Sequence, residues 1–150
     1  QWVYLLSFES TQDMTPGAAE VLKLSFLRAN YASRLVNYLR PFPINRSEAY
    51  MMGMFSALEY IVDATLEEIL QEIPISDVVK DGMIKHEGKA GQLFDLVLSY
   101  ERADWKSTKS LAGELELETN ILAQAYIDCV EEVNSIWESL TAEEDGEAEQ

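Results

Sequence analysis

The single histidine and the single cysteine of this sequence limit the chemistry that the chain can perform. They are His86 and Cys129, among 150 residues. Metal-dependent hydrolysis needs several His and Asp ligands that turn a bound water into hydroxide, so a His-rich centre cannot be built inside this chain. His86 precedes Glu87 and Gly88 at a predicted helix end, where a structural role at the terminus is favoured. Cys129 falls on the apolar face of the last predicted helix, which indicates a buried, inert thiol.

Acidic side chains offer a second kind of site, one for a hard cation. Glu59 and Asp63 are four residues apart on one face of a predicted helix, and Asp95 is a further carboxylate that could replace a missing histidine. A solvated helix face is the commoner role of such a pair, and it is the role that we expect. The sequence therefore assigns no metal, no cofactor and no catalytic residue.

Basic side chains gather in the first third of the chain, and they suggest a third kind of site. Arg28 and Arg34, with Tyr31 between them, are candidates for an arginine-lined nucleotide site. Ion pairs with carboxylates of neighbouring helices are the role that we expect for the two arginines. The glycine-rich phosphate loops G-x-x-x-x-G-K-[ST] and G-x-G-x-x-G are missing from the sequence.

Length and composition indicate one folded domain with an acidic surface. A chain of 150 residues that is 47% hydrophobic can bury a sizeable core. The net charge of −16 opposes contact with nucleic acid or anionic lipid. The lone cysteine suits a reducing cytoplasm, and no apolar run is long enough to predict a membrane span. We expect residues 1–140 to form the domain and residues 141–150 an acidic, flexible tail.

Helix signals run through the whole chain, and no stretch alternates apolar and polar residues as a strand does. Pro16 predicts the start of a long helix, because proline is favoured at the first helical position. Asn45 with Glu48, and Thr65 with Glu68, have capping-box spacing. The residues expected to be helical are 18–39, 47–62, 66–70, 76–84, 93–100, 105–112 and 119–140. The chain is therefore predicted to be all-α, a multi-helix bundle of about seven or eight helices.

Three segments resemble the HDOD domain, the HD-related output domain of bacterial signalling proteins. The stretch Ser47–Val79 reads SEAYMMGMFSALEYIVDATLEEILQEIPISDVV, with Gly53 at the centre of a helix and a short acidic helix after it. It resembles the centre of that domain. Leu22–Val36 and Leu93–Trp105, which read LKLSFLRANYASRLV and LFDLVLSYERADW, are similar to two further helices. Tyr100–Trp105 resembles in particular the HDOD domains that follow an EAL domain in cyclic di-GMP signalling proteins.

The resemblance implies an HD-like bundle without catalysis. In catalytic HD hydrolases, the residues three and four after the central glycine are a metal-binding His and Asp, and here these degenerate HD positions hold Ser56 and Ala57. The resemblance covers most of residues 1–140. It implies the C-terminal part of a larger protein, because the EAL motif and the family's N-terminal helices are not in this sequence. The bundle is therefore expected to be N-terminally truncated.

The function implied by this resemblance is that of a noncatalytic regulatory module in signal transduction. Such a module would modulate a linked EAL domain or contact another signalling protein. Two alternatives stay open. One is a degenerate metal-dependent phosphodiesterase of the HD or HD-GYP type, and the other is sensing of a cyclic nucleotide without turnover.

The opening of the chain is a candidate interaction surface. It carries large apolar side chains at Trp2, Leu5, Leu6 and Phe8. Side chains of this kind tend to be covered by other parts of a protein or by a partner. The partner that we expect is the rest of a longer signalling polypeptide, and a second copy that forms a homodimer is the alternative.

Overall fold

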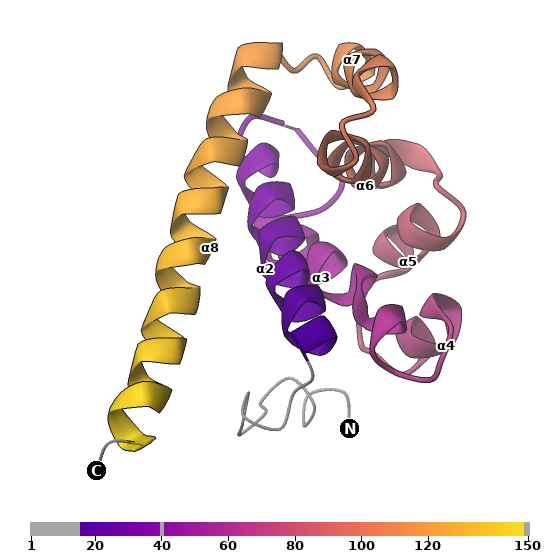
Figure 1. The fold of residues 1–150 in the computed structure, drawn as a ribbon. Helices are drawn as coiled ribbons and strands as arrows, with labels where there is room; N and C mark the ends of the chain where they lie inside the picture. Colours follow the sequence, from indigo (N-terminus) through magenta and orange to yellow (C-terminus); the bar gives the residue numbers. More distant parts are fainter. Residues whose placement is uncertain (1–15, 40, 149–150) are drawn as a thin grey trace.

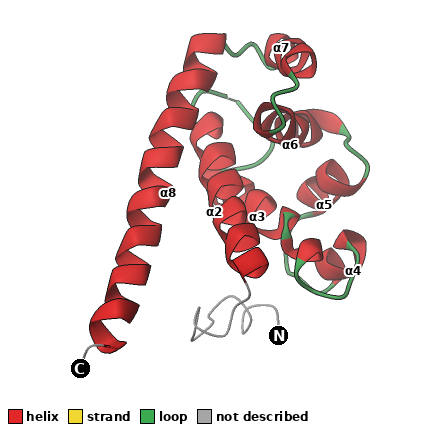
Figure 2. Cartoon of the chain, in the orientation of Figure 1, coloured by secondary structure: helices red, strands yellow, loops and turns green. Residues whose placement is uncertain are grey.

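The computed structural model describes residues 16–39 and 41–148, with the side chains of residue 16 and residues 141–148 left aside (Figure 1). Its elements are α2 (Pro16–Val36), α3 (Arg46–Ser56), the 3-10 helix η2 (Leu58–Tyr60), α4 (Leu66–Gln71), α5 (Asp77–Ile84), α6 (Gly88–Glu101), α7 (Trp105–Glu114) and α8 (Thr119–Ala148). Helices and loops make up all of the described chain, and no strand occurs in it (Figure 2). The predicted all-α class is confirmed.

Helix α2 lies at the centre of the arrangement. It packs against α3 on one side and α8 on the other. Helices α4, α5, α6 and α7 follow one another on the side of α2 that lies away from α8 (Figure 1). The long helix α8 runs antiparallel to α2. The two helices are close where α2 ends, and they diverge toward the beginning of α2 (Figure 1).

Side chains from every described α-helix join one hydrophobic core. Its largest fully buried members are Tyr31, Leu35, Met52, Leu58, Ile69, Leu70, Met83, Leu93, Leu96 and Leu122. Because α4 and α5 are too short to be stable alone in water, packing against this core is what keeps them helical.

Cap geometry confirms the predicted starts of α3, α4 and α5, whereas α6 begins at Gly88, five residues before the expected start. The Glu48 amide donates to Asn45 Oδ1 at 2.8 Å, and the Asn45 amide donates to Glu48 Oε1 at 3.2 Å, so α3 begins with a full capping box. Thr65 accepts from the Glu68 amide at 3.2 Å and caps α4. Ser76 caps α5 in the same way, through the Val79 amide. Each cap satisfies an amide that the first helical turn would leave without a partner.

The helix expected over residues 47–62 is wrong in its second half. Helix α3 ends at Ser56 and the 3-10 helix η2 follows. The Ser56 hydroxyl donates to the Gly53 carbonyl at 2.7 Å, and this side-chain bond competes with the next backbone bond of the helix. After the end of α3, Leu58 is buried in η2 and Ile61 is exposed.

The connection after α5 differs from the expected glycine cap. Helix α5 ends at Ile84, His86 takes a left-handed backbone with φ of 57°, and Gly88 is the first residue of α6. The backbone of His86 lies against α6, because a Cβ added at Gly91 would stand 2.5 Å from the His86 carbonyl carbon. The connection between α5 and α6 is therefore packed closely against α6 at Gly91.

At the other end of the chain, α8 continues to Ala148, beyond the boundary expected at residue 140. The proposed division into residues 1–140 and 141–150 stays a prediction. The expected surface of Trp2, Leu5, Leu6 and Phe8 lies outside the described residues.

Candidate functional site

Ser56 lies in a buried polar site between α2, α3 and α6. Its hydroxyl accepts a hydrogen bond from Arg28 Nη1 at 3.2 Å and donates to the Gly53 carbonyl. The neighbouring Ala57 is fully buried and brings no polar side chain. Of these two residues, Ser56 contacts the guanidinium group of Arg28, and Ala57 contributes a buried methyl group.

Arg28 is held in this site by a two-pronged ion pair. Its Nε donates to Glu101 Oε1 and its Nη2 to Glu101 Oε2, both at 2.8 Å. Only 7% of the Arg28 side chain is exposed, so the charge is largely removed from water. Burial alone lowers the pKa of Arg28, but hydrogen bonding and attraction to Glu101 outweigh it and the pKa is raised. The guanidinium is a permanent cation at this point.

A close approach of two helices brings Ser56 within reach of Arg28. A Cβ added at Gly53 would lie 2.5 Å from the Ala29 amide nitrogen and 2.5 Å from the Arg28 carbonyl carbon. Real side chains do not come that near to a backbone, so only glycine permits this spacing of α2 and α3. Gly53 was predicted at the centre of this helix, and the structure gives it the role of a contact point.

The residues of this site do not fit a metal ion. A cation would have to share the site with the guanidinium of Arg28, and the side chains of Ser56 and Ala57 offer it one hydroxyl and one methyl group. Glu101 is the one carboxylate bonded there, and both of its oxygens are engaged by Arg28. Within residues 16–39 and 41–148, no group of three or more His, Cys, Asp or Glu side chains is placed to hold a metal.

Of the three candidate carboxylates, Glu59 and Asp63 line one open surface pocket, and Asp95 is not part of its lining. Glu59 lies in η2 and Asp63 in the loop that follows it, and both are exposed, so the expectation that they share a helix face is wrong. The early end of α3 explains the difference. Asp95 lies on α6, where its Oδ1 is 2.5 Å from His86 Nδ1. His86 therefore bonds one carboxylate at a helix connection, which agrees with a structural role.

The candidate nucleotide residues are engaged in contacts within the fold. Arg34 pairs with Glu132 of α8, and Arg28 with Glu101, so both predicted ion pairs are confirmed. The Tyr31 hydroxyl is buried and donates to the Leu122 carbonyl at 3.1 Å. These three side chains connect α2 to its neighbours and present no open arginine pair.

An aromatic cluster joins α2, α6 and α8. The Tyr31 ring lies 5.4 Å from that of Tyr100 and 5.2 Å from that of Tyr126, and Tyr100 also packs edge-on against Trp105 at 5.3 Å. Tyr100 and Trp105 belong to the motif that carries the strongest resemblance. That motif also contains Glu101, which sequence reasoning did not select. Its position next to Tyr100, within the same motif, was the available signal.

Cys129 is fully buried on α8, as predicted. Burial raises the pKa of its thiol to about 11, against the opposing charge of Arg34. Since the thiolate is the reactive form, a buried thiol with a high pKa reacts slowly.

We expect Cys129 to react with a disulfide reagent such as dithionitrobenzoate only after unfolding. At pH 8 the reaction of the folded chain should be slower by about 100-fold or more than that of the chain in urea, because the thiolate fraction falls about tenfold for each unit of pKa. Stopped-flow absorbance measures both rates. Similar rates in buffer and in urea would show that the thiol is accessible.

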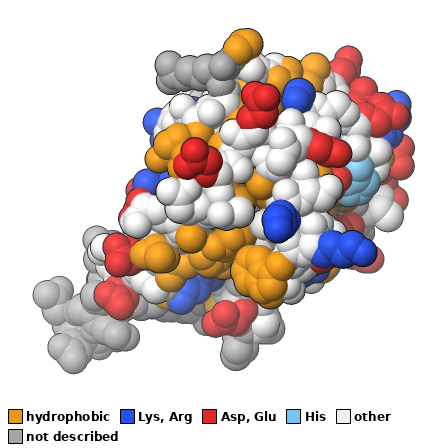
Figure 3. Space-filling view, turned by 90° about the horizontal axis from the view of Figure 1, so that it is seen from above, with side chains coloured by type: hydrophobic (Ala, Val, Ile, Leu, Met, Phe, Trp, Pro, Cys, Tyr) orange, Lys and Arg blue, Asp and Glu red, His pale blue; other side chains and the backbone are white. Residues whose placement is uncertain are grey.

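The surface carries mixed charges. In the view from above, basic side chains lie scattered among acidic and apolar ones, without a continuous basic face (Figure 3). Among the described helices, none is both long and apolar enough to cross a membrane.

Comparison with known proteins shows that this all-α chain is distantly similar in sequence to a bacterial cyclic di-GMP phosphodiesterase. That protein is CdgJ of Vibrio cholerae, to which the chain is 30% identical over 109 residues, which cover 73% of this chain and 25% of CdgJ. The uncharacterized protein YuxH of Bacillus subtilis is 29% identical over 134 residues, which cover 87% of this chain and 31% of YuxH. The chain thus spans between a quarter and a third of the length of these relatives. No family model and no solved structure matches.

Proposed function

We propose that this chain is a noncatalytic regulatory module of the HDOD type, which modulates a cyclic di-GMP phosphodiesterase domain in the same polypeptide. The similarity to CdgJ supports the link with cyclic di-GMP, since that relative is named a cyclic di-GMP phosphodiesterase. The matched part is a quarter of CdgJ, which leaves room for a separate catalytic domain. The motif Tyr100–Trp105 supports the assignment to the HDOD type.

The bond between Arg28 and Ser56 is the observation that carries the proposal of a noncatalytic role. Hydrolysis by an HD-type centre depends on a metal ion that lowers the pKa of its bound water. Here a buried guanidinium contacts the position of one ligand, and a methyl group occupies the position of the other. Repulsion between two cations a few ångströms apart in a partly buried site opposes metal binding there.

A module without a catalytic centre acts by changing the population of states in a neighbouring domain. It does so when one of its faces contacts one state more favourably than another. The acidic surface favours a protein partner over nucleic acid, because phosphates would be repelled. The linked phosphodiesterase domain is the partner that the proposal names.

Cyclic di-GMP hydrolysis tests the proposal. The rate is measured for the complete polypeptide that contains this chain and for the same polypeptide without residues 1–150, with the isolated chain and Mn²⁺ as a third sample. We expect a change of several-fold on deletion and no hydrolysis by the isolated chain.

Two results would contradict the proposal. An unchanged rate on deletion would remove the regulatory role. Hydrolysis by the isolated chain would make it an enzyme, and loss of that activity in Asp95→Asn or Glu59→Gln would then identify the carboxylates as ligands.

A further inference from the structure

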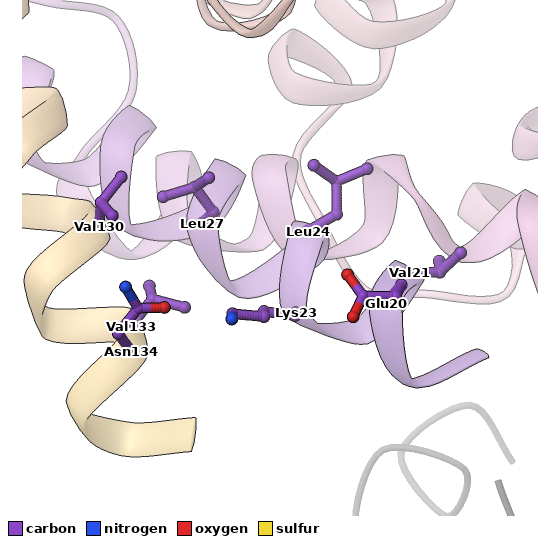
Figure 4. Close-up of a pocket in the computed structure, with 8 residues that line it drawn as sticks. All are labelled: Glu20, Val21, Lys23, Leu24, Leu27, Val130, Val133 and Asn134. Carbon is purple, nitrogen blue, oxygen red and sulfur yellow. The ribbon is translucent and has the colours of Figure 1, made fainter. Parts of the chain in front are cut away.

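Helices α2 and α8 leave an apolar groove between them (Figure 4). Its volume is about 470 Å³, within the range of pockets that hold a ligand or a set of side chains. Leu24 and Leu27 line it from α2, and Val130 and Val133 line it from α8. Three of the eight lining residues are polar, namely Glu20 and Lys23 on α2 and Asn134 on α8. The other five are Val or Leu, so the lining is mostly apolar.

The groove exists because the two helices diverge. Contacts near the end of α2 hold them together, namely the Tyr31 hydroxyl on the Leu122 carbonyl and the ion pair of Arg34 with Glu132. Toward the beginning of α2 the helices separate (Figure 1). Val21 and Leu24 continue the apolar face of α2 there at helical spacing, and among the described residues the lining comes from α2 and α8 alone.

We propose that residues 2–8 of this same chain occupy the groove. Trp2, Leu5 and Leu6 are spaced three and four residues apart, as on one face of a helix, and Phe8 adds a further large apolar side chain. Residues 1–8 carry no charged side chain, in a chain whose formal charge is −16. An apolar, uncharged segment is what an apolar groove with acidic surroundings accepts.

The length of the intervening chain permits this contact. Phe8 precedes Pro16 by eight residues, which can span up to about 28 Å when extended. From Pro16 to Leu27, helix α2 advances about 17 Å at 1.5 Å per residue. The segment can therefore turn back at the start of α2 and lie along the whole groove.

A second copy of the chain fits the groove less well. Glu20 lines the groove from α2, and Glu131 of α8 follows the lining residue Val130; both are exposed. Two copies of a chain with a charge of −16 would bring these carboxylates together, and like charges in contact repel. The segment of residues 2–8 meets no such opposition. This inference is independent of the proposed role in cyclic di-GMP signalling.

Photo-crosslinking in the full chain tests the proposal without removing any segment. A benzophenone amino acid is placed at Leu5, the protein is irradiated, and its peptides are mapped by mass spectrometry. We expect a product of monomer mass, linked to residues 20–27 or 130–134. A product of dimer mass would assign the groove to a second copy, and a link to another part of the chain would place the segment elsewhere. Either result overturns the proposal.

An apolar dye supplies a second test. Removal of residues 1–8 should raise the fluorescence of bound anilinonaphthalene sulfonate several-fold, and a synthetic peptide of residues 1–14 should reverse the rise. Leu24→Glu in the shortened chain should prevent the peptide from reversing the rise. Val78→Glu, at an exposed apolar residue of α5, is the matched control, and the peptide should still reverse the rise in this variant. Equal dye binding by the full and the shortened chain would overturn the proposal.

Discussion

Gly53→Ala is expected to destabilise the protein by at least about 3 kcal/mol, or to prevent its folding. The new methyl group would lie 2.5 Å from backbone atoms of Arg28 and Ala29, which belong to the interior of α2 and cannot move without shifting that helix. Helices α2 and α3 would have to separate. The Arg28 bond to Ser56 would be lost as they do so.

Gly113→Ala is the matched control for this experiment. Gly113 also lies in a helix, but a Cβ added there meets nothing within 4 Å. Alanine favours a helix by up to about 1 kcal/mol over glycine, so this variant should be unchanged or slightly more stable. Urea unfolding followed by circular dichroism measures both. If the two variants lost stability equally, the close approach at Gly53 would not be needed.

Glu101→Leu is expected to cost about 3 kcal/mol or more, because it leaves the guanidinium of Arg28 buried without its counter-ion. The pair lies between α2 and α6 and is largely shielded from water, with 7% of Arg28 and 20% of Glu101 exposed. Breaking a buried pair on one side costs more than the pair contributes, since the remaining charge is left unsatisfied. Urea midpoints are again the measurement.

Two variants separate this effect from a general loss of charge. Glu132→Leu breaks the ion pair between Glu132 and Arg34. About a third of the Arg34 side chain and almost half of the Glu132 side chain are exposed, so the variant should lose less than about 1 kcal/mol of stability. Arg28→Met combined with Glu101→Leu removes both charges and should recover most of the lost stability. A double variant that is no more stable than Glu101→Leu alone would contradict the argument.

The helices were predictable from the sequence because their signals are local. Asn45 and Glu48 are three residues apart, and the bonds that they form depend on little else. The end of α3 was not predictable in the same way. The apolar period continues past Ser56, although the helix ends there and the Ser56 hydroxyl donates to the Gly53 carbonyl.

The site was predictable in part. The absence of a His and an Asp after Gly53 is visible in the sequence, and so is the tendency of Arg28 to find a carboxylate. Which carboxylate it finds is not visible, because Glu101 lies 73 residues away and meets Arg28 only when α6 packs on α2. Asp95 and His86 are nine residues apart, and their contact depends on the turn between α5 and α6, where His86 has a left-handed backbone that the helix signals did not predict.

The antiparallel arrangement of α2 and α8 has a mechanical consequence. The beginning of α2 and the end of α8 lie at the same end of the molecule, where the two helices are farthest apart (Figure 1). A force applied between these two points would load the contacts one after another, starting at the groove and reaching those near the end of α2 last. Tension would therefore separate α8 from α2 one contact at a time, at low force. Helices pulled from opposite ends must instead break all their contacts at once.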